Sequence, residues 1–234
     1  SLILDSLERF RQIKVIEPDS VYLLQNIENE GKYVQKKINK VINMDDILNN
    51  EMIFKNHPSI LQILGFFFSK ANKENEEIES SIITEYMTNG SLQDLYEEKN
   101  TDLINELTDT KKFIILLGIA YCILHLHLNE YDDFSLKPRK ILLDDNCFPI
   151  ICLTDFSQKK YIFNEKCKLR KRKMKEFSKI VYNFYANEKT KDDELLDFSS
   201  IENEWLRSFI LKYYTIDESF LYIDLIDELI NNKN

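Results

Sequence analysis

The spacing of apolar residues changes once along the chain, near residue 87, and no other feature restricts the fold as strongly. Before this point, short runs rich in β-branched and aromatic residues alternate with polar turns, which is typical of antiparallel strands. Strands are predicted at residues 10–16, 20–25, 32–38, 60–68 and 80–86. A polar stretch with spaced apolar positions predicts one helix at residues 44–55.

After a turn signal at residues 87–90 the pattern becomes helical. Helices are predicted at residues 109–128, 173–186, 202–214 and 219–230. Two short apolar runs, at residues 141–143 and 150–153, predict strands. The fold class is therefore α+β: a β-rich part at residues 1–86, with a five-stranded sheet and one helix, precedes a helical part at residues 87–234.

The composition restricts the partners of the chain. Its 31 Lys and Arg against 40 Asp and Glu give a net charge of −9, which argues against a nucleic-acid partner because such binders are basic. The four cysteines lack metal-binding spacing and are expected to be reduced thiols of a cytoplasmic protein. No leader sequence is visible, and the longest apolar stretches are too short or too interrupted for a membrane span.

Three sets of residues are candidate interaction surfaces. Residues 166–175 contain seven Lys or Arg and are expected to form a solvated loop or to dock an acidic partner. Residues 70–79 are acidic and hydrophilic, which predicts a loop. The third set is aromatic, and its members either pack in the core or meet a partner: Trp205, Tyr213, Tyr214 and Phe220.

Three sequence motifs occur in a fixed order along the chain. The first is NHPSILQILGFFF at residues 56–68 with SSIITEYMTNGSLQDL at residues 80–95, the second is SLKPRKILLDDN at residues 135–146, and the third is TDFS at residues 154–157. Together they resemble the protein kinase superfamily, of the tyrosine-kinase-like and serine/threonine kinase-like type. The resemblance implies a two-lobed protein-kinase-like fold with a β-rich N-lobe and a truncated helical C-lobe.

The resemblance also implies a nucleotide site. Thr84 corresponds to the gatekeeper residue, Glu85 and Met87 to the hinge, and Lys36, within GKYVQKKIN, to the lysine of the third strand. Val34 shares the face of Lys36 because side chains alternate along a strand. The cofactor-binding residues implied are Lys36, Thr84, Glu85, Met87, Val21, Val34, Leu142 and Asp155. The cofactor would be ATP, and Asp155 would hold Mg²⁺.

The turn that covers the phosphates in this family departs from the family pattern. Backbone N–H groups approach phosphate closely only where side chains are absent. Residues 16–20 (IEPDS) contain no glycine, Pro18 has no N–H donor, and the carboxylates of Glu17 and Asp19 repel phosphate. ATP binding is therefore expected to be weak. The helix glutamate that pairs with the strand lysine is also missing, because its position holds Leu48; Glu51 is an alternative.

The catalytic-loop motif departs from the family at both reactive positions. Ser135 stands at the catalytic aspartate, and losing a positioned base lowers the rate by roughly 10²–10⁴-fold. Lys140 replaces the metal-binding asparagine, and an ammonium has no lone pair for a cation. His127, eight residues before Ser135, matches a histidine of the family and supports this register. Asp132 and Asp133 remain alternative bases.

The activation segment of the family is nearly absent. About fifteen residues separate Ser157 from the helix predicted at residues 173–186, and they contain no APE motif. Ser157 replaces the glycine of the DFG motif, and Lys173 stands where the resemblance places an aspartate that anchors the catalytic loop. A platform for a peptide substrate is therefore not expected.

These departures favour a pseudokinase, a catalytically impaired kinase-like domain that acts as a scaffold or allosteric regulator for a protein partner that the sequence does not identify. One alternative is a divergent active serine/threonine-type kinase that uses Lys36, Asp155 and Asp133 to transfer the ATP γ-phosphate to protein. Another is a nucleotide-binding module without turnover. A third is an unrelated α+β interaction domain, in which the order of motifs would be a coincidence.

Overall fold

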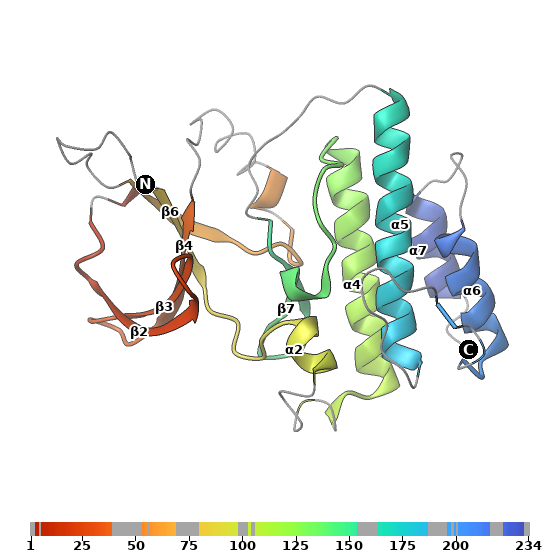
Figure 1. Ribbon diagram of the computed structural model, residues 1–234, viewed down its shortest axis with the longest axis horizontal. Coiled ribbons are helices and arrows are strands. Elements are labelled where there is room, and N and C mark those ends of the chain that lie inside the picture. The colour runs from red at the N-terminus through yellow and green to blue at the C-terminus, as the bar shows by residue number, and fades with distance from the viewer. Residues whose placement is uncertain are drawn as a thin grey trace. The chain divides into compact units, whose positions relative to one another are not determined.

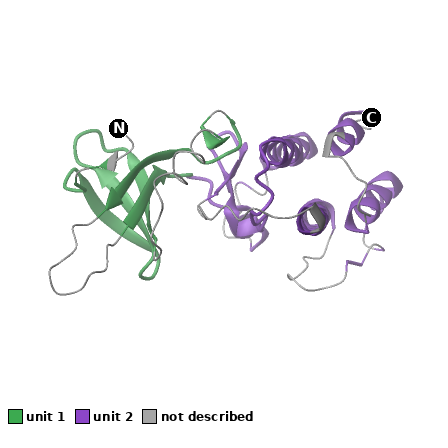
Figure 2. Cartoon of the chain, turned by 90° about the horizontal axis from the view of Figure 1, so that it is seen from above, with its two compact units in different colours: residues 1–87 green, residues 88–234 purple. Residues whose placement is uncertain are grey.

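The computed structural model divides into two compact units, Ser1–Met87 and Thr88–Asn234, coloured separately in Figure 2. The residues that the structure describes are 3–4, 6–38, 53–55, 57–68, 80–97, 103, 106–153, 163–186, 196–197, 199, 201–215 and 222–231. Several sequence predictions lie outside them: most of the helix at residues 44–55 with Leu48 and Glu51, the loop at residues 70–79, the motif at residues 154–157 with Asp155, and Phe220.

Unit 1 is built on a six-stranded sheet with the order β1-β5-β6-β4-β3-β2 (Figure 1). Its strands are β1 Ile3–Leu4, β2 Phe10–Glu17, β3 Val21–Asn26, β4 Lys32–Ile38, β5 Ile63–Phe68 and β6 Ser80–Glu85. Strands β2, β3 and β4 form an antiparallel meander, and β6 pairs antiparallel with both β4 and β5. Strands β3 and β6 bury apolar side chains, Leu23, Leu24, Ile82 and Ile83 among them, which belong to the core of unit 1.

The sixth strand corrects the expectation of five. Residues Ile3 and Leu4 pair parallel with Phe66 and Phe67 of β5. This pairing requires a residue without a side chain at position 65, because a Cβ on Gly65 would lie 2.8 Å from Cγ of Leu4. A two-residue strand is too short to show the alternation of apolar and polar residues from which strands are predicted.

Unit 2 is helical and carries one small hairpin. Its elements are α2 Leu92–Tyr96, α4 Asp109–Leu128, the 3₁₀ helix η1 Pro138–Lys140, β7 Ile141–Leu143, β8 Pro149–Ile151, α5 Phe163–Tyr185, α6 Glu204–Tyr214 and α7 Tyr222–Asn231. Helix α4 packs against α7 and β8, and α5 packs against α6. Side-chain caps fix three helix starts, from Ser91 to α2, from Thr108 to α4 and from Asn203 to α6.

Helix α4 is the central apolar element of unit 2. By length and composition alone it could cross a membrane, contrary to the expectation that the longest apolar stretches are too short or too interrupted. In this structure it is a core helix, because residues on its inner face, such as Ile115, Ile119 and Ile123, are fully buried. A helix with apolar residues on most sides is typical of a protein interior as well as of a membrane span.

Helix α5 begins at Phe163, ten residues before the predicted start at residue 173. The basic residues 166–175 therefore belong to a helix, and the expectation of a solvated loop was wrong. Lys and Arg are good helix formers. The prediction failed because the buried stripe through Cys167, Met174 and Phe177 also contains Lys173, so its apolar spacing is interrupted.

Candidate functional site

The strand register of unit 1 brings four predicted nucleotide-site residues to one face of the sheet. Lys36 of β4 lies opposite Val21 of β3, and Val34 lies opposite Thr84 of β6. Residues directly opposite each other in paired strands share a face, and residues two apart along a strand do so as well. Val21, Val34, Lys36 and Thr84 therefore form one contiguous set.

The gatekeeper and hinge positions end strand β6. Thr84 is only 4% exposed, and its hydroxyl donates a hydrogen bond to the Glu85 carbonyl over 3.3 Å. Glu85 lies opposite Tyr33 and is exposed, whereas Met87 is half-buried. Position 84 thus contributes to the core of unit 1, and the hinge positions lie at its surface.

The turn between β2 and β3 is tight and acidic. The Ser20 N–H donates to the Glu17 carbonyl over 3.3 Å, and the Ser20 hydroxyl donates to the Glu17 carboxylate over 3.2 Å. Asp19 adopts a left-handed backbone conformation with φ of 58°, as a three-residue hairpin turn often requires. Two exposed carboxylates therefore lie where the family has a phosphate-binding loop, and this turn does not fit an ATP phosphate.

The catalytic-loop motif of unit 2 runs from residue 131 into the 3₁₀ helix η1. Pro138 begins η1, and the Lys140 N–H donates to the Lys137 carbonyl over 2.8 Å. The Lys140 carbonyl accepts from the Cys152 N–H over 2.8 Å, which fixes the backbone at this position. Leu142, the predicted apolar wall, lies in β7 opposite Ile150 and forms an isolated bridge with Ser91.

The Ser135 side chain lies where the resemblance places the catalytic base. Its hydroxyl oxygen is buried and has no hydrogen-bond partner within the described part of the chain. A general base must come within hydrogen-bond reach of the proton that it removes. Both the chemistry and the burial of Ser135 therefore oppose that role.

The two alternative bases contact helix α5. Asp132 is 5% exposed, with one carboxylate oxygen 3.2 Å from Nδ1 of His127 and the other 3.7 Å from the guanidinium of Arg170. Asp133 is one-third exposed and lies 3.4 Å from the guanidinium of Arg172. Both carboxylates are thus held in ion pairs within unit 2.

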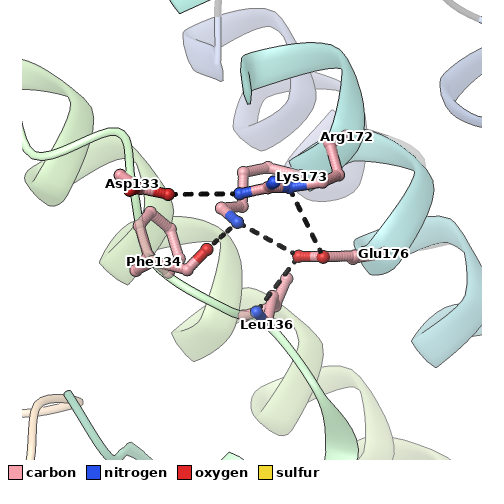
Figure 3. Close-up of polar contacts among 6 residues, drawn as sticks. All are labelled: Asp133, Phe134, Leu136, Arg172, Lys173 and Glu176. Atoms are coloured by element: carbon pink, nitrogen blue, oxygen red, sulfur yellow. Dashed lines mark hydrogen bonds and ion pairs between the residues drawn. The ribbon is translucent and has the colours of Figure 1, made fainter. Parts of the chain in front are cut away.

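Lys173 is the most deeply buried charged residue of the described chain, at 1% exposure. Its ammonium donates to the Phe134 carbonyl, lies 3.3 Å from a Glu176 carboxylate oxygen, and is 4.6 Å from the centre of the Phe134 ring (Figure 3). Burial lowers the pKa of Lys173, and the Glu176 charge opposes this shift. The same Glu176 oxygen accepts a hydrogen bond from the Leu136 N–H over 3.1 Å.

These contacts form a continuous interface between residues 130–136 and α5, which we call the loop–helix interface. Its pairs are Glu130 with Lys166, Asp132 with Arg170, Asp133 with Arg172, Phe134 with Lys173, and Leu136 with Glu176. The two segments pair in the same order along the chain. The basic residues 166, 170, 172 and 173 therefore have partners within the chain, which the sequence interpretation missed.

One sequence signal pointed to this interface. Residues 166, 170 and 173 follow helical spacing and lie on one side of a helix. Acidic residues cluster at positions 130, 132 and 133, in a chain that is acidic overall. The charge complementarity was visible, but residues 166–175 were predicted to form a loop, and a loop has no helical face on which to align the basic residues.

The described residues cover the expected Mg²⁺ site only in part. No group of three or more His, Cys, Asp or Glu side chains that could hold a metal occurs among them. Position 140 carries an ammonium, and Asp155 lies outside the described residues. For ATP, the face through Lys36 and Thr84 fits, whereas the β2–β3 turn does not.

The antiparallel sheet, the capped helix α2 and the catalytic-loop motif followed by a short hairpin define a protein-kinase-like domain. A family model described as protein tyrosine and serine/threonine kinase matches residues 29–205, which is more than half of the chain. The chain therefore belongs to the protein tyrosine and serine/threonine kinase family. This confirms the predicted α+β kinase-like fold and excludes the unrelated interaction domain.

Similar proteins are kinases of plants and of a social amoeba. A probable receptor-like protein kinase of Arabidopsis thaliana is 33% identical over 131 residues, which are 53% of this chain and 15% of that protein. A leaf rust 10 disease-resistance locus receptor-like protein kinase-like protein of the same plant is 30% identical over 129 residues, 52% of this chain and 19% of that protein. A probable serine/threonine-protein kinase of Dictyostelium discoideum is 30% identical over 100 residues, 40% of this chain and 17% of that protein. The chain thus spans less than a fifth of these relatives.

Proposed function

We propose that this kinase-like domain is a pseudokinase, which transfers no phosphate and acts by binding a protein partner. The observation that carries the proposal is the buried hydroxyl of Ser135 at the position of the catalytic base. A serine there accepts a proton poorly, and its burial keeps a substrate hydroxyl away. The fold supplies the rigid surface on which a scaffold or allosteric regulator depends.

The state of the neighbouring carboxylates supports the proposal. An active kinase of this sequence needs a base in place of Ser135, and Asp133 is the candidate. Asp133 instead pairs with Arg172, and the buried Asp132 pairs with His127 and Arg170. Each carboxylate that could take the place of the missing base thus already has a basic partner on α5.

The partner that we propose is a protein, and the compartment is the cytoplasm. The net charge of −9 disfavours nucleic acid. The four cysteines that the structure records as free thiols agree with a reducing compartment. The loop–helix interface engages four of the seven basic residues at 166–175, the first candidate surface for an acidic partner, and therefore makes that surface a weaker candidate.

A second candidate, a nucleotide-binding module without turnover, has one observation in its favour. Val21, Val34, Lys36 and Thr84 share one sheet face, as nucleotide contact from unit 1 requires. In this reading Lys36 pairs with phosphate oxygens without Mg²⁺.

Two measurements on the purified chain test these functions. Transfer of radiolabelled phosphate from ATP to a generic protein substrate tests activity, and we expect none above a protein-free blank. Thermal unfolding with ATP, with and without Mg²⁺, tests binding, because a ligand that binds only the folded state raises Tm. A Tm rise that K36M removes supports the second candidate, whereas measurable transfer that D133N removes overturns the proposed pseudokinase.

A further inference from the structure

We infer that Lys173 and Glu176 of α5 are the positioning residues of the degenerate catalytic loop. In place of the aspartate that the family resemblance puts at position 173, they offer the loop backbone a hydrogen-bond donor at position 173 and an acceptor at position 176. The inference deepens the proposed function and rests on it, because it states how the loop of a pseudokinase is held without an activation segment. All of its contacts lie within unit 2.

The pair contacts the loop backbone at one carbonyl acceptor and one N–H donor. The Lys173 ammonium donates to the Phe134 carbonyl, and the Glu176 carboxylate accepts from the Leu136 N–H over 3.1 Å. Figure 3 shows both side chains directed toward residues 134–136 from one turn of α5. The two residues also pair with each other over 3.3 Å, so the charges on the two backbone contacts stabilise one another.

The arrangement excludes the aspartate that the family resemblance places at position 173. A carboxylate there can only accept hydrogen bonds, whereas the Phe134 carbonyl is itself an acceptor. Two acceptors facing each other in a buried position leave both without a donor, which is costly. The acceptor for a loop N–H is supplied one turn later, by Glu176.

The burial of Lys173 requires this set of contacts. An isolated buried ammonium is strongly disfavoured unless it is paired and hydrogen-bonded. Here a carbonyl, a carboxylate and the face of the Phe134 ring surround it. Because Phe134 directly precedes Ser135, these contacts also set the backbone from which the Ser135 side chain projects.

The outer ion pairs of the interface contact side chains of the loop and not its backbone. Two outer pairs, Glu130 with Lys166 and Asp133 with Arg172, are at least one-quarter exposed on both side chains. Exposed ion pairs contribute little to stability, because solvent and salt screen them. Position 173 and its neighbour 176 therefore decide whether the loop keeps its conformation.

A charge-swap experiment on the full chain separates this role from that of an ordinary ion pair. The variant K173E/E176K keeps the attraction between the two side chains but reverses both backbone contacts. We expect the exchange rate of the Leu136 amide hydrogen to rise at least about tenfold, as loss of a charge-assisted hydrogen bond allows. The matched control E165K/K168E swaps an exposed pair at the same spacing in α5 and should leave this rate within about twofold.

Reference amides and single variants keep the test decisive. The Ile119 amide in α4 reports global opening, so a positioning role raises the Leu136 rate relative to Ile119, and a general loss of stability raises both. If the swap does not fold, K173M and E176A are measured: each should raise the Leu136 rate relative to Ile119, E176A by at least about tenfold.

A Leu136 rate that is unchanged in the swap, or in both single variants, overturns the inference. The outcome is separate from that of the proposed function. Phosphate transfer by the wild-type chain contradicts the pseudokinase and does not alter amide exchange, whereas unchanged exchange contradicts the positioning role and leaves the transfer assay as it was.

Discussion

The ammonium of Lys173 donates a hydrogen bond to the carbonyl of Phe134, the residue directly before Ser135. The position of the missing catalytic base and the buried cation of helix α5 thus belong to one structural unit. Replacement of the base and replacement of the anchor are physically coupled, since Lys173 and Glu176 contact the two peptide groups that flank Ser135.

Restoring a carboxylate at position 135 should destabilise the chain. The Ser135 hydroxyl oxygen is buried, and an aspartate there would place a charge beside Asp132 and Asp133 with no cation assigned to it. We expect S135D to lower the free energy of unfolding by about 2 kcal/mol, measured by urea denaturation.

The exposed Ser208 in α6 offers the matched control. S208D should change the free energy of unfolding by less than about 0.5 kcal/mol, because the new charge stays in water. If S135D is as stable as S208D, the side chain at position 135 is accessible, and the main support for the pseudokinase is lost.

The two loop carboxylates should differ in their contribution to stability. Asp132 is buried between His127 and Arg170, so D132N leaves a partly buried guanidinium without its charge partner. We expect D132N to lower the free energy of unfolding by about 2–3 kcal/mol. Asp133 is one-third exposed, and D133N should lower it by less than about 1 kcal/mol. Equal effects of the two variants in urea denaturation contradict the burial described for Asp132.

Elements with a strong local signal could be predicted from the sequence. Strand β4 and helix α4 have the bounds expected, 32–38 and 109–128, because a turn signal at residues 28–31 precedes the strand and the helix is one long, strongly apolar run. The start of α5 could not be found in this way, since Lys173 occupies a buried position of the stripe. A buried lysine is predictable only when its partners are known, and those lie about forty residues earlier in the chain.

The candidate site was predicted in part for the same reason. Strand alternation places Lys36 and Val34 on one face, whereas Thr84 and Val21 were expected at the site from the family resemblance. The packing of α5 on the loop and the burial of the Ser135 oxygen are tertiary features, and no local pattern encodes them. The acidic and basic clusters carried a signal for that packing, but pairing them requires the helical face of residues 166–173.

The short strand β1 should depend on the absence of a side chain at position 65. A Cβ on Gly65 would lie 2.8 Å from Cγ of Leu4, so G65A forces Leu4 or the strand to move. We expect G65A to lower the free energy of unfolding by about 1–2 kcal/mol in urea denaturation.

A double-mutant cycle with L4A tests the cause. In the L4A background the opposing side chain is gone, and G65A should lower the free energy of unfolding by less than about 0.5 kcal/mol. A cost of G65A that is the same in both backgrounds would show that contact with Leu4 is not responsible and that the effect arises within β5.

The buried Lys173 should give the chain a specific pH dependence. Burial lowers its pKa in the folded state, while the unfolded chain keeps the ordinary lysine value of about 10.4. Between the lowered pKa and this value the unfolded state binds more protons, so the free energy of unfolding rises with pH. Below the lowered pKa both states are protonated, and the free energy of unfolding no longer changes with pH through this group.

The variant K173M has no ammonium to titrate and should lack this contribution. The difference in the free energy of unfolding between wild type and K173M should therefore grow in favour of wild type as pH rises through the window. Urea denaturation from about pH 8 to about pH 10 measures that difference, and K168M, which removes an exposed lysine of the same helix, should keep the wild-type slope. A difference between wild type and K173M that shrinks with rising pH contradicts the lowered pKa and, with it, the buried position of the ammonium.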